Sequence, residues 1–250
     1  IFRDATPEML VVGNLSADSV TQLGHELKQQ MQSHATRDWQ SQYVSFDKPL
    51  KANLQQPGSS TDSALAALYI PLGYSEYQSM ANSSMLSQIV QPWFYNQLRT
   101  KEQLGYAVFA FQMPVGRQWG VGFLLQSNSR QPDWLLQRYQ AFYPEAEKRL
   151  RNMSQADFAQ YQQAMINDLQ QRPQTLDEEA DRYSRDFDRQ NETFDTRQKV
   201  IEQVQLLTPA SVADFFRKAV IEHNGMVMTS QIAGSNNGKI DYARQPGWKT

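Results

Sequence analysis

The positions of apolar residues along the chain predict a series of strands. Continuous apolar runs at 9–12 and 64–70 are typical of buried strands. Residues 106–113 carry apolar side chains on both faces, and a glycine-containing turn leads from them into a second strand-like run at 119–125. These two runs predict an antiparallel hairpin, and a last apolar run at 226–232 predicts a closing strand.

Helical periodicity and capping residues fill the intervals between these strands. Residues 77–98 have a helical pattern, in which Pro92 is expected to introduce a kink or a division. Further helices are expected to begin at capping residues, which are Ser16, Ser154 and Thr208. This mixture predicts an α+β fold, with a layered sheet and helices packed on one face.

Polar segments with glycine and proline mark the divisions of the chain. Residues 55–60 have the composition of a turn or linker, so a domain boundary is expected within residues 38–60. The tail at 235–250 contains glycine and proline without periodicity and is expected to be loosely held. No internal repeat is visible in the chain.

Composition limits the partners and the chemistry. The 250 residues are 40% hydrophobic, enough for a core, and 24 basic and 26 acidic residues give a net charge of -2. No segment concentrates basic residues, which argues against nucleic acid as a partner. No apolar stretch reaches the roughly 20 residues that span a bilayer. The absence of cysteine excludes disulfides and thiolate metal sites, and leaves the redox compartment open.

The three histidines do not form a metal-binding pattern. His25 and His34 are about half a turn out of phase on a helix, so their rings point to opposite faces. His25-Glu26 lacks the second histidine that an H-x-x-E-H motif requires, and the only other histidine is His223. We therefore predict no metal site in this chain.

Nucleophilic catalysis is not indicated either. The chain has no cysteine and no G-x-S-x-G motif. Its serines at 59–60 and 83–84 have no histidine nearby in sequence, although distant histidines could meet them in the fold. Paired acidic residues between 177 and 195 are mixed with basic ones, which is typical of a solvated helix face.

The corner at residues 98–106 carries the strongest functional signal. It joins a predicted helix to a predicted strand, with Arg99 at one end and Tyr106 at the other. Arginine is always charged and tyrosine is a neutral donor near pH 7, so the pair could hold a peptide carbonyl or a developing oxyanion. On the residues alone a structural interpretation stays open, in which Arg99 caps the carbonyls of its own helix and Tyr106 simply begins a strand.

The nonamer from Leu98 to Tyr106 stands among further distinctive segments, which are Phe94-Tyr95-Asn96-Gln97, Val108-Phe109, Leu124-Leu125-Gln126-Ser127 and Leu207-Thr208-Pro209. Together they resemble the C-terminal part of the pitrilysin and insulin-degrading enzyme family, over nearly the whole chain. Members of this family are zinc metallopeptidases with an inverted H-x-x-E-H motif. The present chain has no such motif.

The resemblance implies an architecture and a division of the chain. Members of the family are built from several α+β units, arranged as two bowl-like halves around a chamber. On this basis residues 1–45 are expected to end a preceding unit, residues 46–59 to form a linker, and residues 60–234 to form the C-terminal unit. The tail at 235–250 follows that unit.

The resemblance also implies a function. In the family the arginine and tyrosine of this run contact the substrate backbone near the scissile bond, and these roles fall on Arg99 and Tyr106. Zinc is then bound outside this chain, in the N-terminal half of the same enzyme, and this chain alone is inactive. Peptides and polypeptides are the implied substrates, and the bacterial members imply a periplasmic location. The alternative is a non-catalytic peptide-binding or assembly module of the same fold.

Overall fold

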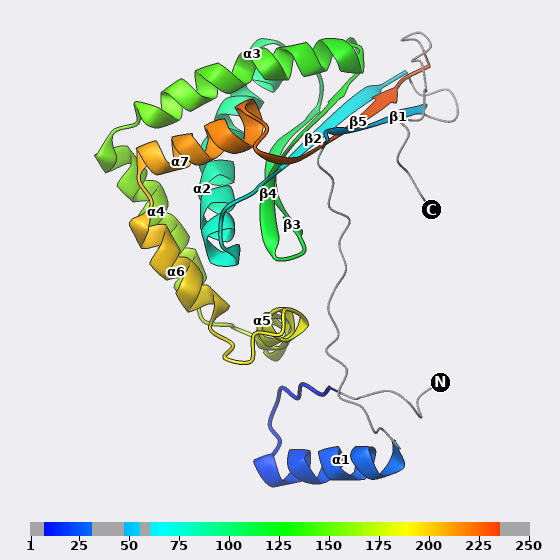
Figure 1. Cartoon of the computed structure of the whole chain (residues 1–250), viewed down its shortest axis with the longest axis vertical. Helices are drawn as coiled ribbons and strands as arrows, with labels where there is room; N and C mark the ends of the chain where they lie inside the picture. The colour runs from blue at the N-terminus through cyan, green and yellow to red at the C-terminus, as the bar shows by residue number, and fades with distance from the viewer. Residues whose placement is uncertain (1–7, 32–47, 56–60, 236–250) are drawn as a thin grey trace. The chain divides into compact units, whose positions relative to one another are not determined.

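The computed structural model describes residues 8–31, 48–55 and 61–235 of the chain (Figure 1). These residues belong to two units. Residues 8–31 and 170–198 form the helical unit, and residues 48–55, 61–169 and 199–235 form the sheet unit. The predicted corner at residues 98–106 lies wholly in the sheet unit.

A five-stranded sheet forms the centre of the sheet unit, and its strands are β1 (Leu50–Gln55), β2 (Ser63–Pro71), β3 (Ala107–Val115), β4 (Gln118–Ser127) and β5 (Gly225–Ala233). Their order is β1-β5-β2-β4-β3, with β1 parallel to β5 and every other neighbouring pair antiparallel. The predicted hairpin is confirmed as β3 and β4. Its tight turn contains Gly116 at a φ of +63°, which a short hairpin turn favours.

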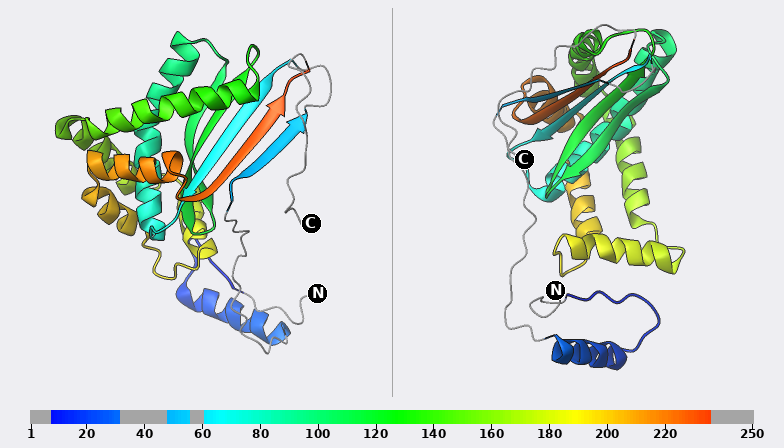
Figure 2. Two further views of the ribbon diagram at one scale, coloured as in Figure 1. Left: turned by 45° about the horizontal axis from the view of Figure 1, so that its top comes forward. Right: turned by 90° about the vertical axis from the view of Figure 1, so that its right-hand side faces the viewer.

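Three helices pack on one face of this sheet (Figure 2), and they are α2 (Glu76–Tyr95), α3 (Pro132–Arg151) and α7 (Pro209–Phe216). Phe94 from α2 meets Phe123 from β4 and Tyr139 from α3 at ring-centroid separations of 5.1 and 5.2 Å. Phe216 from α7 meets Phe123 at 6.4 Å. The predicted α+β layered sheet with helices on one face is confirmed.

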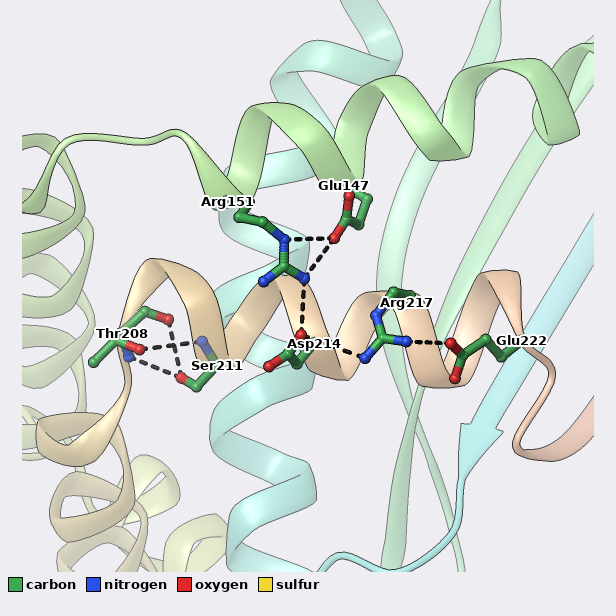
Figure 3. Close-up of polar contacts among 7 residues, drawn as sticks. All are labelled: Glu147, Arg151, Thr208, Ser211, Asp214, Arg217 and Glu222. Carbon is green, nitrogen blue, oxygen red and sulfur yellow. Dashed lines mark hydrogen bonds and ion pairs between the residues drawn. The ribbon is translucent and has the colours of Figure 1, made fainter.

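Two of the predicted helix caps in the sheet unit are confirmed. Ser154 Oγ accepts the Asp157 N–H at 3.0 Å and begins α4 (Gln155–Gln170). Thr208 Oγ1 accepts the Ser211 N–H at 3.1 Å and begins α7 (Figure 3). α4 runs beside α6 (Thr196–Leu206), where the Gln162 side chain donates to the Val204 carbonyl at 2.7 Å.

The helical unit contains α1 (Ala17–Gln30) and α5 (Leu176–Asp188). Ser16 caps α1 as predicted, since its Oγ accepts the Ser19 N–H at 3.1 Å. The buried strand predicted at 9–12 is wrong, because these residues are irregular and Met9 is exposed. No strand in the described part of this unit could pair with them, and an unpaired strand leaves its backbone groups without partners.

Two further expectations in the sheet unit need correction. Residues 50–55, which fall in the predicted linker, form β1, because they pair with β5 from far along the chain. Pro92 does not divide the predicted helix, because α2 continues through it to Tyr95 and then passes into a π-helical turn, η1 (Asn96–Lys101). Residues 236–250 lie outside the described residues, so the loosely held tail stays a prediction. The overall domain division stays a prediction as well.

Candidate functional site

The corner between α2 and β3 has a defined backbone path. Two backbone hydrogen bonds close it, from the Glu102 N–H to the Gln97 carbonyl at 3.0 Å and from the Leu104 N–H to the Leu98 carbonyl at 2.9 Å. Gln103 between them adopts a φ of +51°, in the left-handed region. The predicted helix-to-strand turn is therefore confirmed.

Glycine is required where the corner enters β3. A Cβ atom on Gly105 would lie 1.8 Å from the Gln126 carbonyl oxygen of β4, far inside van der Waals contact. Ser127 on the same strand donates its hydroxyl to the Leu104 carbonyl at 2.5 Å. The corner therefore packs directly against the end of β4, through the close backbone approach at Gly105 and the hydrogen bond from Ser127.

A half-buried ion pair holds the corner from the other side. The Arg138 guanidinium of α3 bonds both carboxylate oxygens of Glu102, with Nε at 3.0 Å from Oε1 and 2.8 Å from Oε2. The Gln97 amide donates to the same carboxylate at 2.6 Å. The Arg138 hydrogen bonds hold the pKa of Glu102 below its ordinary value, and those to Glu102 raise the pKa of Arg138. This ion pair ties α3 to the corner.

Tyr106 follows this anchored corner and presents its ring to solvent. Its side chain is 57% exposed, and its hydroxyl donates to Asp62 Oδ2 at 3.1 Å. The Gln126 amide donates to the same oxygen at 3.1 Å. Partial desolvation and the hydrogen bond to the Asp62 carboxylate raise the pKa of the Tyr106 phenol above its ordinary value. Tyr106 is therefore a protonated donor at neutral pH.

Arg99 lies in η1 and is partly exposed. Within the described ranges its guanidinium has no hydrogen-bond or ion-pair partner, so the carbonyls of its own helix are not capped by it. No hydrogen bond among the described residues joins Arg99 to Tyr106. The structure places both residues on one corner, with the Arg99 guanidinium partly exposed and the exposed Tyr106 hydroxyl donating to Asp62.

Metal ligands do not gather in the part of the chain that the structure describes. No group of three or more His, Asp or Glu side chains there could hold an ion. His223 is exposed and stacks on Tyr69 at 5.7 Å, His25 lies in the helical unit, and His34 lies outside the described residues. Among the described helices, none is long and apolar enough to cross a membrane.

Known proteins share both the sequence and the fold of this chain. The family model described as "PQQ synthase PqqF-like, C-terminal lobe domain 4" matches residues 85–184, which include the corner. The chain is 57% identical to Protease 3 of Salmonella typhi over 98% of its own length, and 54% identical to Protease 3 of Escherichia coli (strain K12) over 99%. A crystal structure of pitrilysin covers 95% of the chain at 53% identity, with a TM-score of 0.83. The chain belongs to the pitrilysin family.

This membership confirms the resemblance inferred from the corner motifs and their flanks. The chain covers only part of these relatives, because it spans 26% of the length of both Protease 3 relatives and 25% of the pitrilysin chain. It corresponds to about a quarter of a pitrilysin-family protein.

Sequence patterns missed several partners of this pitrilysin-family corner. Asp62 and Arg138 contact the corner from 44 and 36 positions away, so no local pattern indicates them. Glu102 lies within the distinctive nonamer, and its charge between two apolar segments was the one sequence signal that could have indicated an ion pair at the corner. Phe109 and Met113 are exposed apolar residues on β3, the edge strand of the sheet.

Proposed function

We propose that this chain is the C-terminal, substrate-binding part of a zinc-dependent metalloendopeptidase, a hydrolase that cleaves peptides and polypeptides. Support comes from the identity to Protease 3 over nearly the whole chain. The observation that carries the proposal is the anchored corner, which carries Arg99 on η1 and Tyr106 at the entry to β3. The N-terminal half of the same protein is the partner that completes the enzyme.

Arg99 and Tyr106 act on the backbone of the bound peptide near the scissile bond. Both are hydrogen-bond donors at neutral pH, so they stabilise the negative charge that develops on the carbonyl oxygen. Neither serves as a base, because the guanidinium has no acceptor and the phenol stays protonated. The ion pair of Glu102 and Arg138 keeps the corner in place while the substrate binds.

The zinc ion belongs to the remainder of the protein. The described residues do not fit a zinc site, since they lack a group of three ligating side chains. We therefore assign this chain no step at the metal. A periplasmic location is proposed from the similarity to the bacterial Protease 3 proteins.

Cleavage of a quenched fluorogenic peptide by the full-length protein tests this function. Tyr106→Phe should lower kcat by about 10²–10³, the usual loss for one oxyanion donor, while zinc removal by a chelator abolishes cleavage. Tyr161→Phe is the matched control, because its ring lies on α4 and its hydroxyl has no partner among the described residues. An unaltered kcat/KM for Tyr106→Phe would remove the tyrosine from the mechanism. A wild-type protein that binds the peptide without cleaving it would favour a non-catalytic peptide-binding module.

A further inference from the structure

Three strand ends meet at the Tyr106 hydroxyl. Tyr106 immediately precedes β3, Gln126 lies near the end of β4, and Asp62 immediately precedes β2. The strand register brings them together, because Ala64 and Ala107 both stand opposite Gln126. Asp62 Oδ2 accepts from Tyr106 Oη and from Gln126 Nε2, each at 3.1 Å.

The hydrogen bond to Asp62 matters because packing does little to hold Tyr106. With 57% of its surface exposed, the ring is only partly covered by neighbours, so packing alone restricts its rotamer weakly. A hydrogen bond to a carboxylate is stronger than one between neutral groups, and this one also links the starts of β3 and β2, the two strands that flank β4. It therefore selects one ring orientation before any peptide arrives.

The single phenol proton sets the order of events. In the structure this proton is donated to Asp62, so donation to a peptide oxygen requires the hydroxyl to exchange one acceptor for the other. An exchange between acceptors around a fixed oxygen needs only rotation about the Cζ–Oη bond. The ring itself does not have to change its rotamer, so the hydroxyl stays oriented toward the reacting centre.

We propose that Asp62 is a positioning residue for the peptidase reaction, which holds the Tyr106 hydroxyl at the strand ends until that hydroxyl donates to the bound peptide. This inference rests on the proposed function of Tyr106. Asp62 acts through Tyr106 and is not itself a donor to the substrate. It lies outside residues 85–184, the part of the chain that the family model matches.

A double-mutant cycle in the full-length protein tests the proposal. Asp62→Ala should lower kcat/KM about tenfold, mainly through kcat, as expected for the loss of a charge-assisted hydrogen bond that orients a donor. In a Tyr106→Phe background the same substitution should change kcat/KM less than about twofold, because the hydroxyl on which it acts is gone. Asp62→Asn keeps an accepting oxygen in place and should recover most of the loss.

Controls separate positioning from general structure. Asp168→Ala removes an exposed carboxylate on α4 that has no partner in the described part of the chain, and it should leave kcat/KM unchanged. Urea unfolding of every variant checks the fold. Equal losses from Asp62→Ala in both backgrounds would show a structural role and overturn the inference, as would a rise in kcat on Asp62→Ala. No effect of Tyr106→Phe would remove Tyr106 from the proposed mechanism and would overturn this inference with it. A loss in Tyr106→Phe without one in Asp62→Ala would overturn this inference alone.

Discussion

Two helix-to-strand corners in the sheet unit follow the same backbone path. In one, α2 passes through η1 into β3, and in the other, α7 passes through the π-helical turn η2 (Arg217–Ile221) into β5. The first turn is closed by the Glu102 N–H on the Gln97 carbonyl, and the second by the Glu222 N–H on the Arg217 carbonyl. The side chains repeat this pattern, because Gln97 bonds to Glu102 and Arg217 bonds to Glu222.

The exits of the two corners also correspond. Each has a left-handed residue, Gln103 at a φ of +51° and His223 at +55°. Each then has a glycine against a neighbouring strand, since a Cβ on Gly105 would meet the Gln126 carbonyl oxygen at 1.8 Å and one on Gly225 would meet that of Ile70 at 2.1 Å. The shared path is a solution to joining a helix to a sheet, and it needs no catalytic residue.

The difference between the corners lies in two side chains. Ala219 and Met226 stand in the second corner at the positions that Arg99 and Tyr106 occupy in the first. Ala219 is buried, whereas Arg99 and Tyr106 reach solvent. The donors are therefore additions to a structural corner, so function and stability should respond to different substitutions.

The largest effect should come from giving the first corner the side chains of the second. Arg99→Ala with Tyr106→Met should lower kcat/KM by about 10³ or more, because two donors to the developing oxyanion are removed. The urea-unfolding midpoint should fall only slightly, since Arg99 has no partner in the described residues and the exposed Tyr106 loses only its hydrogen bond to Asp62. Met226→Leu in the second corner is the control and should leave peptide cleavage unchanged. A double variant that unfolds would refute the separation of roles.

Alanine substitution at either corner glycine should lower the free energy of unfolding, which tests whether the two corners share a backbone path. Gly105→Ala should lower the free energy of unfolding by about 3 kcal/mol through overlap with the β4 backbone. Gly225→Ala should cost about 1 kcal/mol more, because its φ of +149° is strained for any side chain. Gly24→Ala, on α1 with no close contact, should instead stabilise its helix by up to about 1 kcal/mol. Urea unfolding measures all three, and a tolerated Gly105→Ala would contradict the close approach.

The parts of this fold that the sequence predicted are those set by nearby residues. The caps at Ser16 and Thr208 and the hairpin of β3 with β4 depend on side chains a few positions apart. Strand β1 escaped prediction because it is short and pairs with β5 from far along the chain. The repeated corner also escaped, since its two copies share little more than a glutamate and a glycine.

The candidate site divides in the same way. Arg99 and Tyr106 were found through resemblance to a family, because a basic residue at a helix end has an ordinary structural interpretation. Asp62, which holds the Tyr106 hydroxyl, is invisible in sequence, since the contact exists only once β2 and β4 are paired. Their roles in catalysis stay predictions that the substitutions above decide.

The ion pair behind the first corner should have an intermediate effect on stability. Glu102→Gln should cost about 1–2 kcal/mol at neutral pH, because side-chain exposures of only 18% and 23% limit solvent screening of Arg138 and Glu102. The lowered pKa of Glu102 means that its contribution is complete above the ordinary value of 4.5 and is lost as the pH falls through the native value. The wild type and Glu102→Gln should therefore converge in urea unfolding as the pH falls through the native pKa of Glu102. A gap that persists in acid would show that the cost is one of packing.

The smallest effect should come from the corresponding pair in the second corner. Arg217 and Glu222 form an ion pair there (Figure 3), but their side chains are 40% and 46% exposed. Glu222→Gln should therefore cost less than about 0.5 kcal/mol, and about 1 M salt should remove the difference, because exposed charges are screened. Arg217 also keeps Asp214 as a second partner at 3.5 Å. If urea unfolding showed the same cost for Glu222→Gln as for Glu102→Gln, burial would not distinguish the corners. The ion pair of Glu102 and Arg138 would then be part of the shared path rather than a specific support for the donors.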